Sequence, residues 1–240
     1  MGNTQIVLYK ELNEFCNEHY KLKIKNGYVR IYEVDEQKNE KLLKSTDISS
    51  EYLTTEDLEK LKENGVGVHL DIMDGKFVKS LGVKLDIAQS VKQNNLFCDV
   101  HLMVSKPLED GYISKALGLG ADSITIHYEI ENFERVLRFL LLEKNKRMHK
   151  GRNLEIGVAI SPKTSVDVLT RFYKLIDKVL VMSVEPGYGG QKYIESTDMK
   201  IDKIKKKFGI KVEVDGGINK EIIKKDVMKY VDDFVIGSYI

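Results

Sequence analysis

The stretch Val68-His69-Leu70-Asp71-Ile72-Met73-Asp74-Gly75 decides the fold of this 240-residue chain, because it is an apolar run of strand length with polar groups towards its end. A second such run is Asp99-Val100-His101-Leu102-Met103, and a third, Lys211-Val212-Glu213-Val214-Asp215-Gly216-Gly217, brings another carboxylate to a strand end. Two imidazoles and two carboxylates at the same ends of parallel strands would form a nitrogen and oxygen site for a divalent metal. A single residue of this kind could merely close a strand, but together these residues favour a metal site at the strand ends.

Working outward from these runs, short β-type segments alternate with helical ones from residue 41 onward. The pattern predicts strands at 41–48, 66–72, 97–103, 121–127, 154–160, 177–183, 211–215 and 232–237. It predicts helices near 55–64, 85–95, 107–119, 131–149, 165–174, 194–208 and 220–230. This alternation indicates an α/β (β/α)8 TIM barrel over residues 41–240, in which the carboxyl ends of the strands converge on one mouth. The chain stops soon after the last strand, so we expect the final barrel helix to be absent.

Residues 1–40 form a separate N-terminal extension in this interpretation. Asn3 or Thr4 could cap a helix near 4–19 whose apolar stripe is Leu8, Leu12, Phe15 and His19. Asn26-Gly27 is typical of a type I′ hairpin turn, which pairs Ile24 with Val29, Leu22 with Ile31, and Lys25, Lys23 and Lys21 with Tyr28, Arg30 and Tyr32. We expect the helix to cover the groove left by the missing helix, between strands eight and one, with the hairpin at 21–34 as its strap. The alternative is a mobile appendage.

Charge and cysteine content narrow the possible partners and location. The chain has 38 basic and 37 acidic residues, so no global field recruits nucleic acid or an anionic membrane. Cys16 and Cys98 are far apart and lack a CxxC spacing, which suits a reducing compartment. The N-terminus lacks a signal pattern, and no apolar run approaches a membrane span. We therefore expect a cytoplasmic protein that acts on a small molecule, without nucleic-acid or membrane partners, and that forms a homo-oligomer.

The lysines at 203, 205, 206 and 207 are interleaved with Ile201, Ile204 and Phe208 at helical spacing. This pattern predicts the solvated face of a surface helix. A phosphate-binding patch is the alternative.

Glycine-rich loops follow the last three predicted strands. The segment Met182 to Gln191 leaves a strand through Gly187, Gly189 and Gly190, and Gly216-Gly217 and Gly237-Ser238 follow the next two strands. Such loops let backbone N–H groups approach an anion, and barrels often bind phosphate in the loops after strands seven and eight. Turns use glycine in any case. Three such loops in order nevertheless favour a phosphorylated substrate.

The runs HLDIMDGKFV, DVHLMV, ITIHYE, MSVEPGYGGQ, VDGGIN and FVIGS resemble the ordered motifs of the ribulose-phosphate 3-epimerase family, over about residues 45–240. The resemblance implies a barrel enzyme of the pentose phosphate pathway that interconverts D-ribulose 5-phosphate and D-xylulose 5-phosphate. It implies one divalent metal ion per chain, zinc or iron(II) foremost and manganese or cobalt otherwise, on His69, Asp71, His101 and Asp215. It also implies Asp71 and Asp215 as the acid/base pair, and substrate contacts at Thr46, His101, Gly187, Tyr188, Gly189, Gly190, Gly216, Gly217, Gly237 and Ser238.

These residue types suit the implied chemistry. Inverting carbon 3 beside a ketone requires removal of a proton from one face and its return to the other, so one carboxylate on each face would serve as base and acid. A metal bridging the C2 and C3 oxygens would stabilise the enediolate as a Lewis acid. Met73, Met103 and Met182 lie near strand ends and could wall the enediolate with dry, polarizable surface. Ordinary core packing is the alternative for these methionines.

The sequence departs from the family pattern at its first strand and at one loop. Ser45-Thr46-Asp47-Ile48 stands where the family has Pro-Ser-Ile-Leu, so that Thr46 keeps a hydroxyl, and Lys79-Ser80 replaces Pro-Asn. A 3-epimerase of a hexulose 6-phosphate and a non-catalytic homologue that binds a sugar phosphate or a partner therefore stay open. Decarboxylase and aldolase relatives use Asp-x-Lys-x-x-Asp, and Met73 in the lysine position argues against them. His127 and Glu129 also match family positions, without an assignable role.

Overall fold

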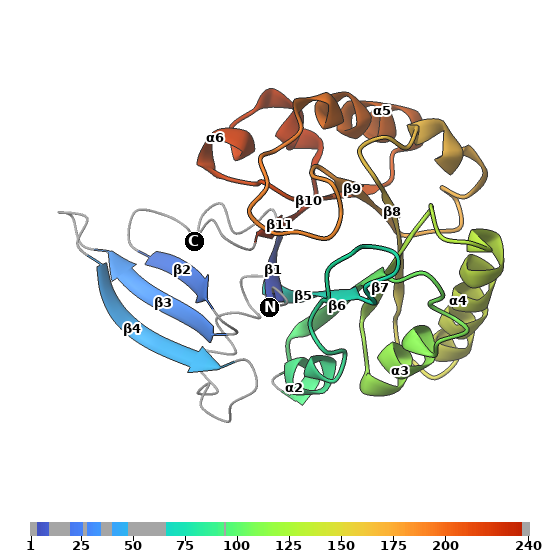
Figure 1. Ribbon diagram of the computed structural model, residues 1–240, viewed down its shortest axis with the longest axis horizontal. Coiled ribbons are helices and arrows are strands. Elements are labelled where there is room, and N and C mark those ends of the chain that lie inside the picture. Colours follow the sequence, from blue (N-terminus) through green and yellow to red (C-terminus); the bar gives the residue numbers. More distant parts are fainter. Residues whose placement is uncertain are drawn as a thin grey trace.

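The computed structural model describes residues 4–9, 20–25, 28–34, 40–47, 66–93 and 95–236. Within them, eight strands close a barrel in the order β1-β11-β10-β9-β8-β7-β6-β5 (Figure 1). The seven strands other than β1 are parallel to one another and follow chain order: β5 (Val66–Met73), β6 (Phe97–Met103), β7 (Ser123–His127), β8 (Glu155–Ile160), β9 (Lys178–Met182), β10 (Lys211–Asp215) and β11 (Asp233–Ile236). Each lies within two residues of its predicted bounds, so the TIM-barrel prediction is confirmed.

Helices cover the outside of the barrel, as Figure 1 shows. They are α2 (Ile87–Gln93), α3 (Tyr112–Leu119), α4 (Phe133–Met148), α5 (Asp198–Phe208) and α6 (Lys220–Ile223), with 3-10 turns η2 (Val166–Arg171), η3 (Glu195–Thr197) and η4 (Asp226–Tyr230). The helix predicted at 165–174 is thus a 3-10 segment, and the one predicted at 55–64 lies outside the described residues. In α4 the apolar residues Phe133, Val136, Leu137 and Leu140 form one buried stripe.

Side chains alternate between the two faces of each barrel strand. In β5, Val68, Leu70 and Ile72 belong to the apolar layer between the strands and the surrounding helices. The residues between them, His69 and Asp71, are in register with Asp99 and His101 of β6. Polar residues therefore share one face of neighbouring strands, and this face lines the interior of the barrel.

The N-terminal segment corrects one prediction. Thr4–Tyr9 is not helical but forms strand β1, which pairs antiparallel with β11 on one side and β5 on the other. The run Ile6-Val7-Leu8 suits a wall strand that is covered on both faces. Pairing with two neighbouring strands therefore decides the conformation of this segment, against the weak helical periodicity of its apolar residues. The segment does lie beside the last parallel strand, as expected, but it fills the wall itself. Residues 10–19 of the predicted helix lie outside the described residues.

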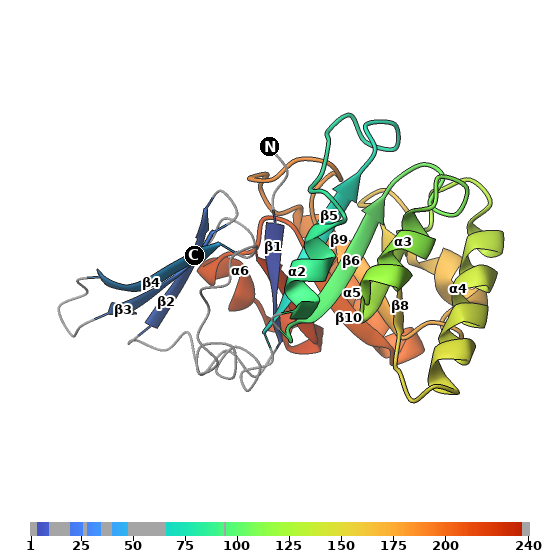
Figure 2. The same ribbon diagram turned by 90° about the horizontal axis from the view of Figure 1, so that it is seen from below.

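The predicted first barrel strand at 41–48 is also wrong in its partners. It is β4 (Glu40–Asp47), which pairs with β3 (Tyr28–Val34) and β2 (Tyr20–Lys25) in a three-stranded antiparallel sheet (Figure 2). The sequence of this strand is also unsuited to a barrel wall. Side chains alternate between the faces of a strand, so Glu40, Lys41, Lys44 and Asp47 would bring charge to both faces that a wall would have to bury. The structure therefore differs from the expected division between 1–40 and 41–240 in two ways. Strand β1 belongs to the barrel, and β4 belongs to the small sheet.

The predicted hairpin register is confirmed. Ile24 pairs with Val29, Leu22 with Ile31, and the lysines at 21, 23 and 25 with Tyr32, Arg30 and Tyr28. The two-residue connection at Asn26-Gly27 fixes this register, because loop length determines which residues of the two strands face each other.

The basic run of α5 lies on the surface, as predicted. Lys203 and Lys207 each lie 2.7 Å from Asp167, while Ile201 and Ile204 on the other side of the helix are buried. The lysines thus form a solvated, ion-paired face. In the part of the chain that the structure describes, no helix is long and apolar enough to cross a bilayer.

Candidate metal centre and substrate pocket

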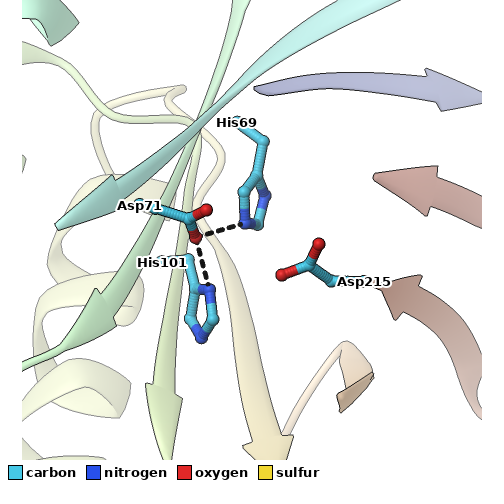
Figure 3. A group of neighbouring side chains, drawn as sticks. All are labelled: His69, Asp71, His101 and Asp215. Carbon is cyan, nitrogen blue, oxygen red and sulfur yellow. Dashed lines mark hydrogen bonds and ion pairs between the residues drawn. The ribbon is translucent and has the colours of Figure 1, made fainter. Parts of the chain in front are cut away.

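The four predicted metal ligands meet at the carboxyl end of the barrel (Figure 3). His69 and Asp71 come from β5, His101 from β6 and Asp215 from the end of β10. All four are buried, and one ligand atom from each lies within 4.8 Å of the others. Asp71 Oδ1 lies 2.9 Å from His101 Nδ1 and 3.3 Å from His69 Nε2. The fold therefore assembles the cluster that the sequence predicted.

The donor set fits a divalent metal ion. Two imidazole nitrogens and two carboxylates suit zinc or iron(II). His69 Nε2 is buried, lies 3.3 Å from Asp71 Oδ1, and lies between Asp71 and Asp215 in Figure 3. A metal ion at this point would accept the lone pair of this nitrogen.

A buried network of charged side chains contacts His69 on the side away from Asp71. Its Nδ1 lies 2.6 Å from Asp99 Oδ2, and the other oxygen of Asp99 lies 2.9 Å from Lys178 Nζ. Lys178 also lies 2.7 Å from Glu213. Asp99, Glu213 and His69 lie close enough together to hold a cation. Here the ammonium group of Lys178 supplies that positive charge.

Sequence reasoning missed this network, although a signal for it exists. Asp99 lies two residues before His101, and Glu213 two before Asp215, so that each pair shares one strand face. The room for the Lys178 side chain comes from Gly157, where an added Cβ would lie 2.2 Å from Thr125 Oγ1 and 3.0 Å from Lys178 Cε.

The two carboxyl groups at the centre differ in pKa. Burial raises the pKa of Asp215 well above its usual value, and the charge of Asp71 adds to this shift. Burial acts in the same direction on Asp71, but hydrogen bonds with His101 and His69 hold its pKa below the usual range. Their surroundings thus push the pKa values of the two carboxyl groups in opposite directions. Such a difference suits an acid/base pair.

The two histidine ligands also differ. Burial lowers the pKa of His101 to about 4, so its ring is neutral at neutral pH. Burial acts to lower the pKa of His69 as well, but the charge of Asp99 and the hydrogen bond with Asp71 raise it above its usual value.

A cavity of about 470 Å³ opens above the two aspartates. Its volume is in the range of small-molecule sites. Met73, Met103 and Met182 all line it, so the structure supports their predicted role as the wall. Gly187, Tyr188 and Gly189 line it as well, whereas Gly190 is not among the lining residues. Ser80, Leu81 and Val184 also line it. The sequence marks Ser80 as a departure from the family pattern and predicts no role for Leu81 or Val184.

The turn after β10 requires its glycines. Gly216 has φ +113°, and an added Cβ would lie 2.3 Å from Val184 Cγ2. At Gly217, with φ +65°, the added atom would lie 2.4 Å from the backbone nitrogen of Tyr193. The hydroxyl of Ser183 lies 2.8 Å from the carbonyl oxygen of Asp215 and holds this turn to β9. Close packing against Val184 and Tyr193 therefore leaves no room for a side chain at either glycine.

Two predicted substrate contacts, Gly237 and Ser238, lie outside the described residues. A third, Thr46, is in β4, where its register partner is Val29 of the small sheet. The prediction for Thr46 depended on a first barrel strand at 41–48 and fails with it, because β1 occupies the wall next to β5.

His127 and Glu129 join the site from the end of β7. His127 Nε2 lies 2.9 Å from His101 Nε2, and His127 Nδ1 lies 3.0 Å from Glu129 Oε2. Both residues are thus connected to a candidate ligand.

Comparison with known proteins agrees with this geometry. A family model described as the ribulose-phosphate 3 epimerase family matches residues 43–240. Ribulose-phosphate 3-epimerase of Chlamydia trachomatis is 32% identical over 189 residues, which cover 75% of this chain and 76% of that protein. The Bacillus subtilis protein of the same name is 35% identical over 179 residues, with 71% and 77% covered.

Among solved structures, a mutant tryptophan synthase alpha-subunit from Pyrococcus furiosus aligns with a TM-score of 0.52 at 13% identity, covering 77% of this chain and 81% of that one. At this identity the likeness concerns the fold alone.

Proposed function

The chain belongs to the ribulose-phosphate 3-epimerase family, and on that premise we propose that it inverts carbon 3 of D-ribulose 5-phosphate to give D-xylulose 5-phosphate. It is an epimerase enzyme, and its relatives' names point to a pentose phosphate. The observation that carries the proposal is the pair Asp71 and Asp215, both buried, which line one cavity from two strands and whose pKa values are shifted in opposite directions.

The two aspartates divide the proton transfer between them. Epimerisation beside a ketone removes the C3 proton from one face, passes through an enediolate, and returns a proton to the opposite face. Asp71 accepts the first proton, and Asp215 donates the second from the opposite face. In the reverse reaction the roles are exchanged. Neither residue can serve both faces, so both are required.

The remaining residues of the site bind and shield the substrate. We assign the phosphate to the backbone of Gly187, Tyr188, Gly189, Gly216 and Gly217, since glycine-rich turns at a barrel mouth suit an anion. Contacts from Gly190, Gly237 and Ser238 stay predictions. The three methionines that line the cavity, Met73, Met103 and Met182, exclude water from the enediolate.

His69, Asp71, His101 and Asp215 would hold one divalent ion. When bound, it would supply Lewis-acid stabilisation of the negative charge that develops on the substrate oxygens. Zinc or iron(II) is the proposed ion because of the nitrogen and oxygen donors, with manganese or cobalt as alternatives.

An assay of metal-loaded protein on D-ribulose 5-phosphate in deuterated water tests the function. We expect D-xylulose 5-phosphate with solvent deuterium at C3, whereas product without deuterium would refute the two-base mechanism. Hexulose 6-phosphates are the comparison substrates, because Ser80 and Leu81 line the cavity beside the altered Lys79-Ser80 segment. A higher kcat/KM for a hexulose phosphate would change the substrate and keep the mechanism. No turnover of either sugar would favour a non-catalytic binding protein.

We also propose a cytoplasmic location and a homo-oligomeric state. A relative from Oryza sativa, 32% identical over 180 residues, is named a cytoplasmic isoform. Light scattering of the purified protein tests the oligomeric state, and a monomeric mass would refute it.

A further inference from the structure

Two histidines meet nitrogen to nitrogen behind the proposed metal centre. His101 Nε2 lies 2.9 Å from His127 Nε2, and both rings are fully buried. At this distance two lone pairs would repel each other, and so would two N–H groups. One proton therefore lies between the rings. The ring that carries it determines which nitrogen of His101 is left without a proton.

The contact of His127 Nδ1 with Glu129 determines which ring carries this proton. Its Nδ1 lies 3.0 Å from Glu129 Oε2. The other oxygen of Glu129 accepts hydrogen bonds from the Ser161 backbone N–H, at 2.8 Å, and from the Thr164 hydroxyl. Burial acts to raise the pKa of Glu129, but the hydrogen bonds from His127 and Thr164 lower it to about 2. An ionised carboxylate only accepts hydrogen bonds, so His127 must carry a proton on Nδ1.

The proton positions then follow along the chain of hydrogen bonds. A His127 ring whose single proton is on Nδ1 has a bare Nε2, which accepts the N–H of His101 Nε2. His101 Nδ1 is then the nitrogen that can bind a metal, and it lies 2.9 Å from Asp71 Oδ1. With no cation at the site, the ionised Asp71 accepts a hydrogen bond from this nitrogen, so Nδ1 is bare only when a divalent ion binds both groups.

We propose that Glu129 and His127 are positioning residues that hold the proton of His101 on Nε2 and thereby present its Nδ1 lone pair to the divalent metal. This inference depends on the proposed function, in which His101 is a metal ligand. Hydrogen bonding of the second ring nitrogen is the usual means of orienting a histidine ligand. In this chain the carboxylate acts through an intervening imidazole.

The surrounding packing holds the relay in place. The Phe77 ring packs against His127 with ring centres 4.8 Å apart. The backbone N–H of Tyr128 donates to the Ala159 carbonyl at 2.9 Å, which fixes the end of β7 against β8. His127 is thus held where its two nitrogens face His101 and Glu129.

Glu129→Gln tests the relay because the amide should invert it. Ser161 N–H and the Thr164 hydroxyl require an acceptor, so the glutamine oxygen is expected to face them and its NH2 group to face His127. The NH2 donates to Nδ1 of His127, which moves that ring's proton to Nε2. His101 must then carry its proton on Nδ1, where it blocks the metal. Glu131→Gln is the matched control, since it removes the same charge two residues away from an exposed side chain outside the relay.

Two readouts that need no substrate decide the matter. In zinc-loaded full-length protein, 15N NMR of the ring nitrogens of its five histidines reports each tautomer. We expect protons on His127 Nδ1 and His101 Nε2 in the wild type, and a proton on His127 Nε2 in Glu129→Gln. Competition with a chelator should show Zn²⁺ binding about 10–100-fold weaker in Glu129→Gln and unchanged in Glu131→Gln.

A wild-type His101 with its proton on Nδ1, or a doubly protonated His127, would overturn the inference even if Glu129→Gln did not fold. An inverted tautomer with unchanged Zn²⁺ affinity would overturn it as well. A wild type that has the expected tautomers and binds Zn²⁺ but does not epimerise would refute the proposed function and leave the relay standing.

Discussion

Asp71 and Asp215 are the same residue type in different surroundings, and their chemistry depends on that difference. Asp71 lies beside two imidazoles, which stabilise its charge. Asp215 faces the charge of Asp71 and the apolar lining of the cavity, both of which favour its protonated form. At the scale of single residues, the site therefore separates base from acid through neighbours rather than through residue identity.

Replacement of either carboxylate should abolish most of the turnover. Asp71→Asn and Asp215→Asn each remove a group that the other face cannot replace, so we expect kcat to fall by about 10²–10⁴-fold. The measurement is turnover of D-ribulose 5-phosphate at saturating metal, with Asp86→Asn as a surface control, since Asp86 is exposed and pairs with Lys115. Near-wild-type turnover in either site variant would show that the two-base assignment is wrong.

Cys98 should be chemically silent in the folded protein. It is fully buried, and burial raises the pKa of its thiol to about 12, with the charges of Asp99 and Asp122 adding to the shift. Since the thiolate is the nucleophile and is scarce below that pH, iodoacetamide at about pH 8 should leave Cys98 unmodified. Peptide mass spectrometry after labelling in buffer and in guanidinium checks this. Equal labelling under both conditions would contradict the burial.

At the scale of elements, each barrel strand presents one apolar and one polar face. β9 carries Lys178 into the interior, where it lies between Asp99 of β6 and Glu213 of β10. The interior thus buries three charged side chains below the proposed metal. These three side chains stabilise the fold only when all of them are paired. A buried charge that loses its partner destabilises the folded state by more than the complete set stabilises it.

Lys178→Met should therefore be strongly destabilising near neutral pH. It leaves Asp99 and Glu213 without their ammonium partner, and loss of one partner from a buried pair typically costs about 3–5 kcal/mol. Burial already raises the pKa of Glu213 to about 7. A raised folded-state pKa means that stability is retained at low pH and lost as pH rises through that value.

The loss in the free energy of unfolding should consequently be smaller at about pH 5 than at about pH 8. Urea unfolding at the two pH values measures it, with Lys150→Met on the exposed turn after α4 as control. A loss below about 1 kcal/mol, on the scale of surface substitutions, would speak against the buried network.

At the scale of the whole molecule, β1 completes the wall of the barrel. It pairs with β11 through Ile6, Val7, Leu8 and Tyr9 and with β5 through Thr4 to Leu8. Without it, β5 and β11 would present unpaired backbone groups along two edges. Exposed edges of apolar strands promote association with other chains.

Deletion of residues 1–36 should therefore cause aggregation or a marked loss of stability. Size-exclusion chromatography and thermal unfolding measure this. Val7→Pro in the full chain is the matched point variant, because proline removes an N–H from a wall strand that is paired on both sides. A soluble truncated protein with unchanged stability and activity would mean that β1 is not required, and that another segment can take its place.

Much of this molecule follows from short-range patterns in the sequence. The register of β2 and β3 follows from a two-residue Asn26-Gly27 connection, which leaves one natural pairing. The seven parallel strands follow from apolar runs of the right length, and the cluster of His69, Asp71, His101 and Asp215 from the convergence of strand ends in a barrel. Each of these depends on neighbours in the chain or on a general property of the fold.

Only the tertiary structure decided the rest. Thr4–Tyr9 and Glu40–Asp47 both have strand-like sequences, and the choice of the wall strand depends on partners far away in the chain. The contact of Lys178 with Asp99 and Glu213 needs the space at Gly157 on a neighbouring strand. The link from Glu129 through His127 to His101 joins two strands at hydrogen-bond distance. The physical reason is the same in each case: local patterns determine which face of an element is polar, whereas the contacts between polar groups depend on distances that exist only after the barrel closes.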